Sequence, residues 1–362
     1  MRKTVTRLFA CVAGLWFPAV VCAALLAWSA GGCSVSTEGI EFFGGDYQAP
    51  EIHAFRVCDE YAVELDMSKD VSLEDAQICI VPEGSAVSSF ALLAEHTFDS
   101  LRIAGIAGNG TQSLRLTFSE QMEIGRRYIL YGRLRDGRSN SLTVAVPFTG
   151  YNYRPPKVLI NEIQSFYSGS AKTKRIEFAE LYVLEDGNLG GLELLSVRKG
   201  DKAAYSFPAL EVKAGEYITL HYRVLAEEED VCVDETGCDV AESGGSYSCV
   251  SARDFWFAGN AKRIDDNADV LILRTADGRI LDGVPYCKKA EKWTDALAES
   301  VEGLVQSGVW DSSAPYIDAE KNTATTSLSR QNQNVPSSAL DWIVVASNNA
   351  TPGEKNSANA KK

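Results

Sequence analysis

The chain has 362 residues, of which 45% are hydrophobic and 23% are charged. This composition is too apolar for a wholly disordered chain and too charged for a protein that crosses a membrane many times. At about 150 residues per domain, the length predicts two domains. There are 49 acidic and 35 basic residues, a net charge of −14, which opposes binding to nucleic acid. His53, His96 and His221 are too far apart in sequence to indicate a His-based metal site or a catalytic triad.

Residues 1–32 have the pattern of a secretory leader. The first seven residues include three basic ones, and no charged residue follows until Glu38. A basic start, an apolar stretch and small residues before a cleavage point are typical of a signal peptide. The Gly32-Cys33 pair resembles the end of a bacterial lipoprotein signal, although Ala30 stands where leucine is usual. This resemblance implies acylation of Cys33, for example with palmitate.

An uncleaved membrane anchor is the alternative, because the uncharged run is long enough to span a bilayer. In both cases the basic flank stays inside, so the rest of the chain lies outside the cytoplasm. We therefore expect a lipid-anchored protein of the bacterial cell envelope, on the periplasmic side or at the cell surface. Removal of the three leader cations leaves 32 basic against 49 acidic residues, a net charge of −17.

Six cysteines remain after the leader and Cys33 are set aside. An even number in an exported chain indicates disulfides. Cys58 and Cys79 form the natural pair if the two halves share no bridge, and the other four allow three connectivities. A zinc site is the competing interpretation, which the absence of a C-x-x-C pair disfavours. The disulfide candidates are Cys58, Cys79, Cys232, Cys238, Cys249 and Cys287.

The first half of the exported chain predicts a tether followed by a β-sandwich. Residues 33–50 contain Gly and Ser without long apolar runs, which indicates a flexible connection. Residues 51–154 alternate apolar and polar side chains in short segments between turns, which is typical of a sandwich. The segment 125–140, with Tyr128 after a glycine turn, resembles bacterial Ig-like modules.

The adjacent pair Pro155-Pro156 predicts a stiff connector and a domain boundary. Beyond it, ten short motifs in one order resemble a lamin-tail domain, an Ig-like β-sandwich that also occurs in exported bacterial proteins. The resemblance implies that residues 155–356 form a second sandwich and that 357–362 form a tail. The motifs are VLINEI (158–163), EFAELY (177–182), LGGLEL (189–194), FPAL (207–210), AGEY (214–217), ADVLIL (268–273), DGRILD (277–282), SLSR (327–330), DW (341–342) and TPGEKN (351–356).

Several acids in these motifs could be mistaken for catalytic groups. In the resembled family, Asn161-Glu162 belongs to a strand start that organises neighbouring turns. We expect Glu177 and Glu180 to be solvent-facing strand or edge residues, because a glycosidase pair needs two acids facing across a cleft. We predict no catalytic residue, no metal ligand and no cofactor.

Two segments depart from the lamin-tail pattern. Residues 226–252 contain eight acids and three cysteines, which predicts a solvated acidic loop stapled by disulfides. Ca²⁺ binding is the alternative, because Ca²⁺ takes acidic oxygen ligands. Residues 294–308 carry apolar side chains at helical spacing between a possible Thr294 cap and Gly308, which predicts a short amphipathic helix that covers an open end of the sandwich.

The sequence as a whole therefore predicts an all-β fold with two Ig-like sandwiches in tandem behind a signal peptide. We expect a non-enzymatic binding, adhesion or scaffolding module whose partner is an envelope or extracellular protein or a polysaccharide. The chain contacts the membrane through its lipid and does not bind nucleic acid. The rival functions are an accessory subunit of an exported hydrolase or envelope transport system, and a purely structural envelope protein.

Overall fold

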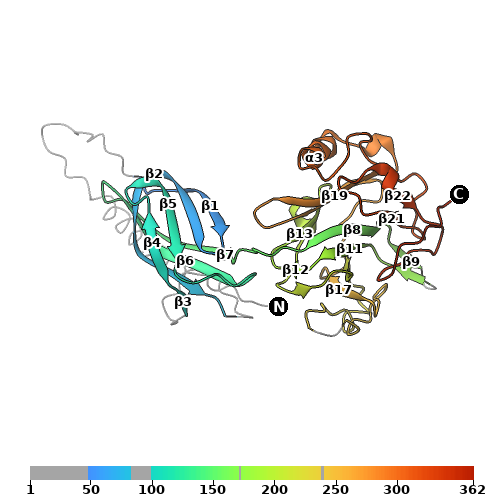
Figure 1. Cartoon of the computed structure of the whole chain (residues 1–362), viewed down its shortest axis with the longest axis horizontal. Helices are drawn as coiled ribbons and strands as arrows, with labels where there is room; N and C mark the ends of the chain where they lie inside the picture. The colour runs from blue at the N-terminus through green and yellow to red at the C-terminus, as the bar shows by residue number, and fades with distance from the viewer. Residues whose placement is uncertain (1–47, 83–98, 171–172, 238–239) are drawn as a thin grey trace, which may run out of the picture. The chain divides into compact units, whose positions relative to one another are not determined.

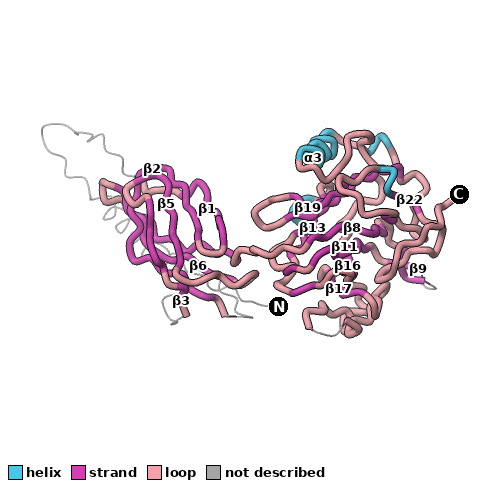
Figure 2. Tube along the Cα trace, viewed as in Figure 1, coloured by secondary structure: helices cyan, strands magenta, loops and turns pink. Residues whose placement is uncertain are grey.

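Strands make up most of the regular structure in the computed structural model, which describes residues 48–82, 99–170, 173–237 and 240–362 (Figures 1 and 2). Within these ranges the one α-helix is α3 (Asp295–Gln306). The predicted all-β class is confirmed. No helix among the described residues has the length and hydropathy needed to cross a bilayer. The leader 1–32, Cys33, His96 and most of the tether lie outside the described residues.

The first sheet is built on one long strand that changes partners along its length. The first half of β2 pairs with β1 and β5, and its second half pairs with β3 and β6. The strands of this sheet are β1 (Ile52–Asp59), β2 (Ala62–Ile80), β3 (Ser100–Leu101), β4 (Ile103–Ala107), β5 (Thr111–Phe118), β6 (Arg127–Asp136) and β7 (Ser141–Thr149).

Alternation along β2 places one set of its side chains in a core. Val63, Leu65 and Met67 are buried and alternate with less buried neighbours, as expected for a strand with one face against the core. The β2–β6 ladder shifts register between Glu74 and Gln77, and such irregularities bend a strand. Residues from both ends of β2, among them Val63 and Ile78, therefore belong to one hydrophobic cluster.

The second half of the chain has two larger sheets that share one core. Leu181 and Leu220 of one sheet and Leu194 and Leu271 of the other belong to a single hydrophobic cluster, the arrangement of a β-sandwich. The six-stranded sheet has the order β17 (Ala252–Trp256), β16 (Tyr217–His221), β11 (Phe178–Glu185), β8 (Lys157–Gln164), β21 (Leu328–Arg330) and β22 (Trp342–Val344). The five-stranded sheet has the order β14 (Ala204–Ser206), β13 (Glu193–Ser196), β18 (Ala268–Arg274), β19 (Ile280–Cys287) and β20 (Ile317–Asp318).

Short elements complete this half. The Asp277-Gly278 turn joins β18 to β19 as the sequence predicts, with Gly278 at φ +87°, a conformation that glycine adopts without strain. The remaining elements are β9 (Ser168–Ser170), β10 (Thr173–Arg175), β12 (Gly187–Asn188), β15 (Glu211–Val212) and the 3₁₀ turns η1 (Gly200–Ala203), η2 (Ala290–Lys292) and η3 (Ala339–Asp341).

Helix α3 forms where the apolar periodicity predicts it, packed beside β18 and β19. Leu297, Val301 and Leu304 are buried in the core of the second sandwich. Thr294 is the N-cap residue but makes no side-chain capping bond. Gly308 ends the helix region with φ +72°, consistent with a glycine stop. The amphipathic helix in the second sandwich is therefore confirmed.

Candidate functional site

A row of polar side chains crosses the outer face of the six-stranded sheet. Glu180 lies directly opposite Glu162 on one side and Thr219 on the other. Ala179 and Leu181, the neighbours of Glu180, belong to the hydrophobic core, so Glu180 points to the opposite face. The pairing continues to both sides of the sheet, and every member is buried. This carboxylate row consists of Asp254, Thr219, Glu180, Glu162 and Ser329.

Glu162 is fully buried, and both of its carboxylate oxygens are hydrogen-bonded. Oε1 accepts bonds from the hydroxyls of Ser327 and Ser329 at 2.5 and 2.7 Å. Oε2 accepts the backbone N–H of Thr351 at 2.9 Å. Burial raises the pKa of Glu162, and these donors act against that rise. The expectation that Glu162 organises neighbouring turns fits this geometry, because one carboxylate joins β8 and β21 to residue 351.

Glu180 is also fully buried, and the expectation that it faces solvent is wrong. Its Oε1 accepts the Asn161 side-chain amide at 2.7 Å, and its Oε2 accepts the backbone N–H of Gly353. Burial, with the neighbouring Glu162 carboxylate adding to it, raises the pKa of Glu180 well above its ordinary range. Two adjacent carboxyls in a dry site disfavour a second negative charge.

Asp254, at one end of the carboxylate row, forms a buried pair with His221. His221 Nε2 lies 2.9 Å from Asp254 Oδ1, and the imidazole stacks on Trp256 with ring centroids 3.9 Å apart. Asp254 Oδ2 accepts the backbone N–H of Cys249 at 3.1 Å. His221 is 0% exposed, so the pair reaches neither solvent nor an open cleft and holds together the loop above the sheet.

The row is buried because the C-terminal segment, residues 346–362, lies over it. Thr351 and Gly353 donate backbone N–H groups to Glu162 and Glu180. Asn356 Nδ2 then donates to the carbonyl oxygens of Asn161 and Arg330 at 2.9 and 2.7 Å. The segment ends beside β22, where Ala360 bridges Val345. Residues 357–362, predicted as a tail after the second sandwich, run beside the chain that follows β22, where the backbone N–H of Lys361 also bonds to the carbonyl oxygen of Val344.

Glu177 is a second acid for which solvent exposure was expected and is not found. It is 0% exposed and makes a two-point ion pair with the buried guanidinium of Arg223. Arg223 also lies under the Tyr167 ring, with its guanidinium carbon 4.1 Å from the ring centroid. Glu177 precedes β11, and its partner Arg223 comes from a segment 46 residues away in sequence, so its burial is decided by tertiary contacts.

The acids of residues 226–252 are partly structural. Glu235 is 1% exposed; its Oε1 accepts the backbone N–H groups of Glu242 and Ser243, and its Oε2 accepts that of Asp254. Glu228 accepts both the amide and the hydroxyl of Ser246. The prediction of a solvated loop is therefore wrong in part. These carboxylates accept backbone N–H groups that, in a loop, have no partner strand to bond to. Asp239 lies outside the described residues.

The described cysteines are free thiols, in contrast to the predicted disulfides. Cys58 lies opposite the start of β2, whereas Cys79 lies next to its end, nearly the length of a 19-residue strand away. Such a separation cannot be bridged without moving the backbone. The Cys58–Cys79 bridge is therefore not formed in this structure. Cys238 lies outside the described residues, and the free thiols are Cys58, Cys79, Cys232, Cys249 and Cys287.

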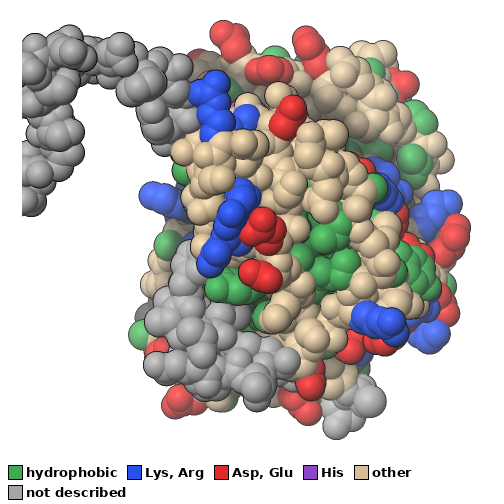
Figure 3. Space-filling view, turned by 90° about the vertical axis from the view of Figure 1, so that its left-hand side faces the viewer, with side chains coloured by type: hydrophobic (Ala, Val, Ile, Leu, Met, Phe, Trp, Pro, Cys, Tyr) green, Lys and Arg blue, Asp and Glu red, His purple; other side chains and the backbone are tan. Residues whose placement is uncertain are grey.

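Basic side chains of the described chain commonly lie beside acidic ones, as on the face drawn in Figure 3. Arg115 pairs with Glu64 at 2.7 Å and with Asp59 at 2.9 Å on the first sandwich. Lys174 pairs with Glu227. No group of three or more His, Cys, Asp or Glu among the described residues is arranged to hold a metal ion.

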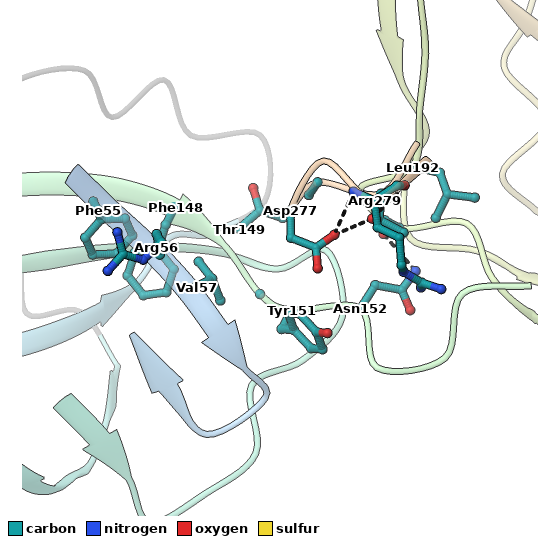
Figure 4. A pocket seen from close by; sticks show the side chains of 14 residues that line it. Phe55, Arg56, Val57, Phe148, Thr149, Tyr151, Asn152, Leu192, Asp277 and Arg279 are labelled. Carbon is teal, nitrogen blue, oxygen red and sulfur yellow. Dashed lines mark hydrogen bonds between the residues drawn. The ribbon is translucent and has the colours of Figure 1, made fainter. Parts of the chain in front are cut away.

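Tyr151 and Asn152 of the segment before Pro155-Pro156 make specific contacts. Tyr151 packs against the core of the first sandwich. The Asn152 amide donates to the carbonyl oxygens of Asn188 and Gly190 at 2.6 and 2.9 Å. Figure 4 shows Tyr151 and Asn152 among the side chains that line a pocket at this point.

A known protein family matches most of the second half of the chain. The model of the family TP_1001_2nd, described as protein second domain, matches residues 156–344. This is more than half of the 362 residues. The chain belongs to the TP_1001 second-domain family. The match spans β8 to β22 and so includes Glu162, Glu180 and Asp254, whereas the C-terminal segment that covers them lies beyond it.

The chain is also similar to a curated protein and to solved structures. An uncharacterized protein of Treponema pallidum is 31% identical over 206 residues, covering 53% of this chain and 50% of that protein. The chain thus spans about half the length of that relative. A DUF4876 family protein from Bacteroides thetaiotaomicron is 10% identical, with 78% of this chain and 90% of that chain covered and a TM-score of 0.29. The N-terminal part of the bacterial S-layer protein SbsC is 13% identical, with 48% and 40% covered and a TM-score of 0.24.

Sequence reasoning singled out Glu162 and Glu180 but did not bring them together. The signal that could have joined them was the TPGEKN motif at 351–356, whose backbone amides bind both carboxylates. It also did not separate His221 from the other histidines, although His221 and Asp254 lie on the adjacent strands β16 and β17. Strands β16 and β17 pair in parallel although most of the segment 226–252 lies between them in sequence. No local sequence pattern indicates such a pairing.

Proposed function

We propose that the protein is a non-enzymatic module of the bacterial cell envelope that binds or scaffolds an envelope or extracellular protein or polysaccharide. The supporting observation is that the acidic residues that could act in catalysis are buried and hydrogen-bonded within the protein. Glu162, Glu180 and Asp254 are fully buried and hydrogen-bonded to the chain itself. Substrate contact would require displacement of the C-terminal segment.

The same geometry supports a rigid carrier of exposed loops. Binding residues commonly lie on loops that a packed scaffold positions. In the second sandwich the hydrogen bonds of Thr351 to Glu162 and of Asn356 to Asn161 tie the C-terminal segment to the sheet across 189 and 195 residues of sequence. The proposal includes lipid attachment at Cys33, and it retains the lamin-tail resemblance of residues 155–356 as a prediction.

The first test follows the anchor in intact cells. The full chain and its Cys33→Ser variant are expressed in a bacterial host, labelled with a fatty-acid probe and separated into soluble and envelope fractions. The wild-type chain is expected in the envelope with label, and the variant without it. Label on Cys33→Ser, or a mature chain that still begins at Met1, would contradict lipid anchoring at Cys33.

The second test addresses chemistry. The purified full chain is assayed with phosphodiester, ester and glycoside substrates in the presence of divalent cations, beside Glu162→Gln and Glu180→Gln variants. No turnover is expected from any of the three proteins. Turnover that copurifies with the wild type and falls in either variant would overturn the non-enzymatic proposal. Copurification with an exported hydrolase whose activity depends on this chain would favour the accessory role.

A further inference from the structure

A shallow hollow of about 340 Å³ opens where three distant segments of the chain meet. Lys174 and Arg175 come from β10, Tyr247 from the loop 226–252, and Asn348 and Ala350 from the C-terminal segment. Its volume is within the range of ordinary small-molecule sites. None of its lining residues belongs to the carboxylate row.

The polar groups of the hollow are mainly hydrogen-bond donors. The half-buried guanidinium of Arg175 donates to the side-chain oxygen of Asn348, which fixes its plane. A guanidinium has five N–H donors, so this one bond leaves others for a ligand. Burial raises the pKa of the Tyr247 hydroxyl, and the positive charge of the neighbouring Arg175 acts against that rise.

Among the described residues no carboxylate lines the hollow, although the chain carries a net charge of −14. Glu227, which does not line the hollow, forms an ion pair with Lys174. The bond of Arg175 to Asn348 uses one guanidinium N–H, so the hollow has a cationic group with further N–H donors and no acidic side chain in its described lining. Arginine recognises planar carboxylate and phosphate groups through paired N–H donors.

The backbone is strained on both sides of Arg175. Tyr247 has φ +68° and Asn348 has φ +62°. A positive φ is tolerated by asparagine but is a real outlier for a bulky aromatic residue. The Tyr247 ring packs on Phe178, with centroids 5.3 Å apart, which holds the residue in place. Strain of this kind gathers at ligand-binding positions.

We propose that this hollow binds an oxyanion, a carboxylate or a phosphate, carried by a ligand of about monosaccharide size. Arg175 pairs with the oxyanion through the N–H groups that its bond to Asn348 leaves over, and Tyr247 lines the hollow beside it. The inference rests on the proposed binding function and gives that function a ligand class.

The test uses three probes that differ at one carbon. Glucuronate carries a carboxylate, glucose 6-phosphate carries a phosphate, and glucose is the neutral control. Binding to the purified full chain is measured by calorimetry and by ligand-observed NMR at low and physiological ionic strength. At least one acid sugar is expected to bind, more weakly at higher salt, and glucose is not. The better of the two acids identifies the carboxylate or phosphate as the source of the oxyanion.

Variants separate the site from general charge effects. Arg175→Gln is expected to lower the affinity about ten- to a hundredfold, the usual worth of a charged hydrogen bond. Asn348→Asp keeps the shape and the left-handed backbone but places a carboxylate against Arg175, so it is expected to abolish binding even if Arg175→Gln folds poorly. Lys213→Gln removes an exposed cation that pairs with Asp186 outside the hollow, and it is expected to bind as the wild type does.

Three outcomes would overturn the site. They are no binding of either acid sugar by the folded chain, equal binding of glucose, and wild-type affinity in both Arg175→Gln and Asn348→Asp. Failure of the site leaves envelope anchoring intact, because anchoring is measured by fractionation and labelling. A cytoplasmic or catalytic chain would instead fail the earlier tests while this binding persisted.

Discussion

Each buried charge in the second sandwich is stabilised in its own way. Arg330 and Asp282 form a closed ion pair at 2.6 Å, with side chains 2% and 1% exposed. Glu162 relies on hydroxyl and amide donors, whereas Asp269 receives backbone N–H groups and one hydroxyl. Burial of a charge is costly unless it is paired or hydrogen-bonded, so these residues are the most sensitive positions of the fold.

We predict that Arg330→Met lowers the free energy of unfolding by about 3–5 kcal/mol, because it leaves Asp282 as an uncompensated buried charge. Urea unfolding followed by tryptophan fluorescence measures the change. The control is Lys213→Gln, whose pair with Asp186 is 69% and 57% exposed and is worth about 0–1 kcal/mol. Equal effects of the two substitutions would contradict the prediction.

A second prediction concerns pH. Burial raises the pKa of Asp269 to about 6 from an ordinary value of 3.8. The pKa of Asp269 is higher in the folded chain than in the unfolded chain. Its contribution to the free energy of unfolding is therefore complete below about pH 4 and is lost as pH rises through 6. The shift of about 2 units corresponds to about 3 kcal/mol.

Urea unfolding of the wild type and of Asp269→Asn between about pH 4 and pH 8 tests this effect. The stability of the wild type is expected to fall with rising pH by about 3 kcal/mol more than that of Asp269→Asn, which has no carboxyl to titrate. The same pH dependence in both proteins would show that Asp269 is not the group responsible.

At the scale of elements, the C-terminal segment is the part that converts an open sheet face into a buried one. Its contacts are mainly backbone N–H groups on carboxylates, so they depend on the path of the main chain. Gly353 is central to that path. It has φ +76°, and an added Cβ would lie 2.7 Å from Cys249 Sγ and 2.8 Å from Ser251 Oγ.

We therefore predict that Gly353→Ala destabilises the protein more than Gly278→Ala does. Both glycines have positive φ, which costs an alanine about 1–2 kcal/mol, but an added Cβ at Gly278 meets nothing within 4 Å. Chemical unfolding gives the two costs. Hydrogen exchange of residues 346–361 should become faster only in Gly353→Ala. Unchanged exchange in that variant would contradict the role of the segment.

Local elements were largely predictable. The 294–308 helix followed from the spacing of Leu297, Val301 and Leu304, and the β18–β19 hairpin from Asp277-Gly278. Both depend on contacts between residues close in sequence. The burial of Glu180 was not predictable in this way, because the group that covers it, the Gly353 amide, is 173 residues away.

At the scale of the whole molecule, the excess of acids governs long-range encounters. We predict that the purified chain does not bind duplex DNA at physiological salt, because such binding requires cations that neutralise phosphates. Fluorescence anisotropy with labelled duplex DNA over a range of salt concentrations measures this. Tight binding that weakens steeply with salt would refute the prediction and would direct attention to Lys172, Lys174 and Arg175.

The sequence by itself determined the all-β class, the helix in the second half and the acidic charge, because periodicity, turn residues and composition are properties of short segments or of simple sums. Only the tertiary structure decided that the outer face of the six-stranded sheet is buried, that Glu162 and Glu180 are neighbours, and that Cys58 and Cys79 lie apart. These facts depend on strand pairing and on the path of residues 346–362, which bring together groups whose separation along the chain carries no local signal.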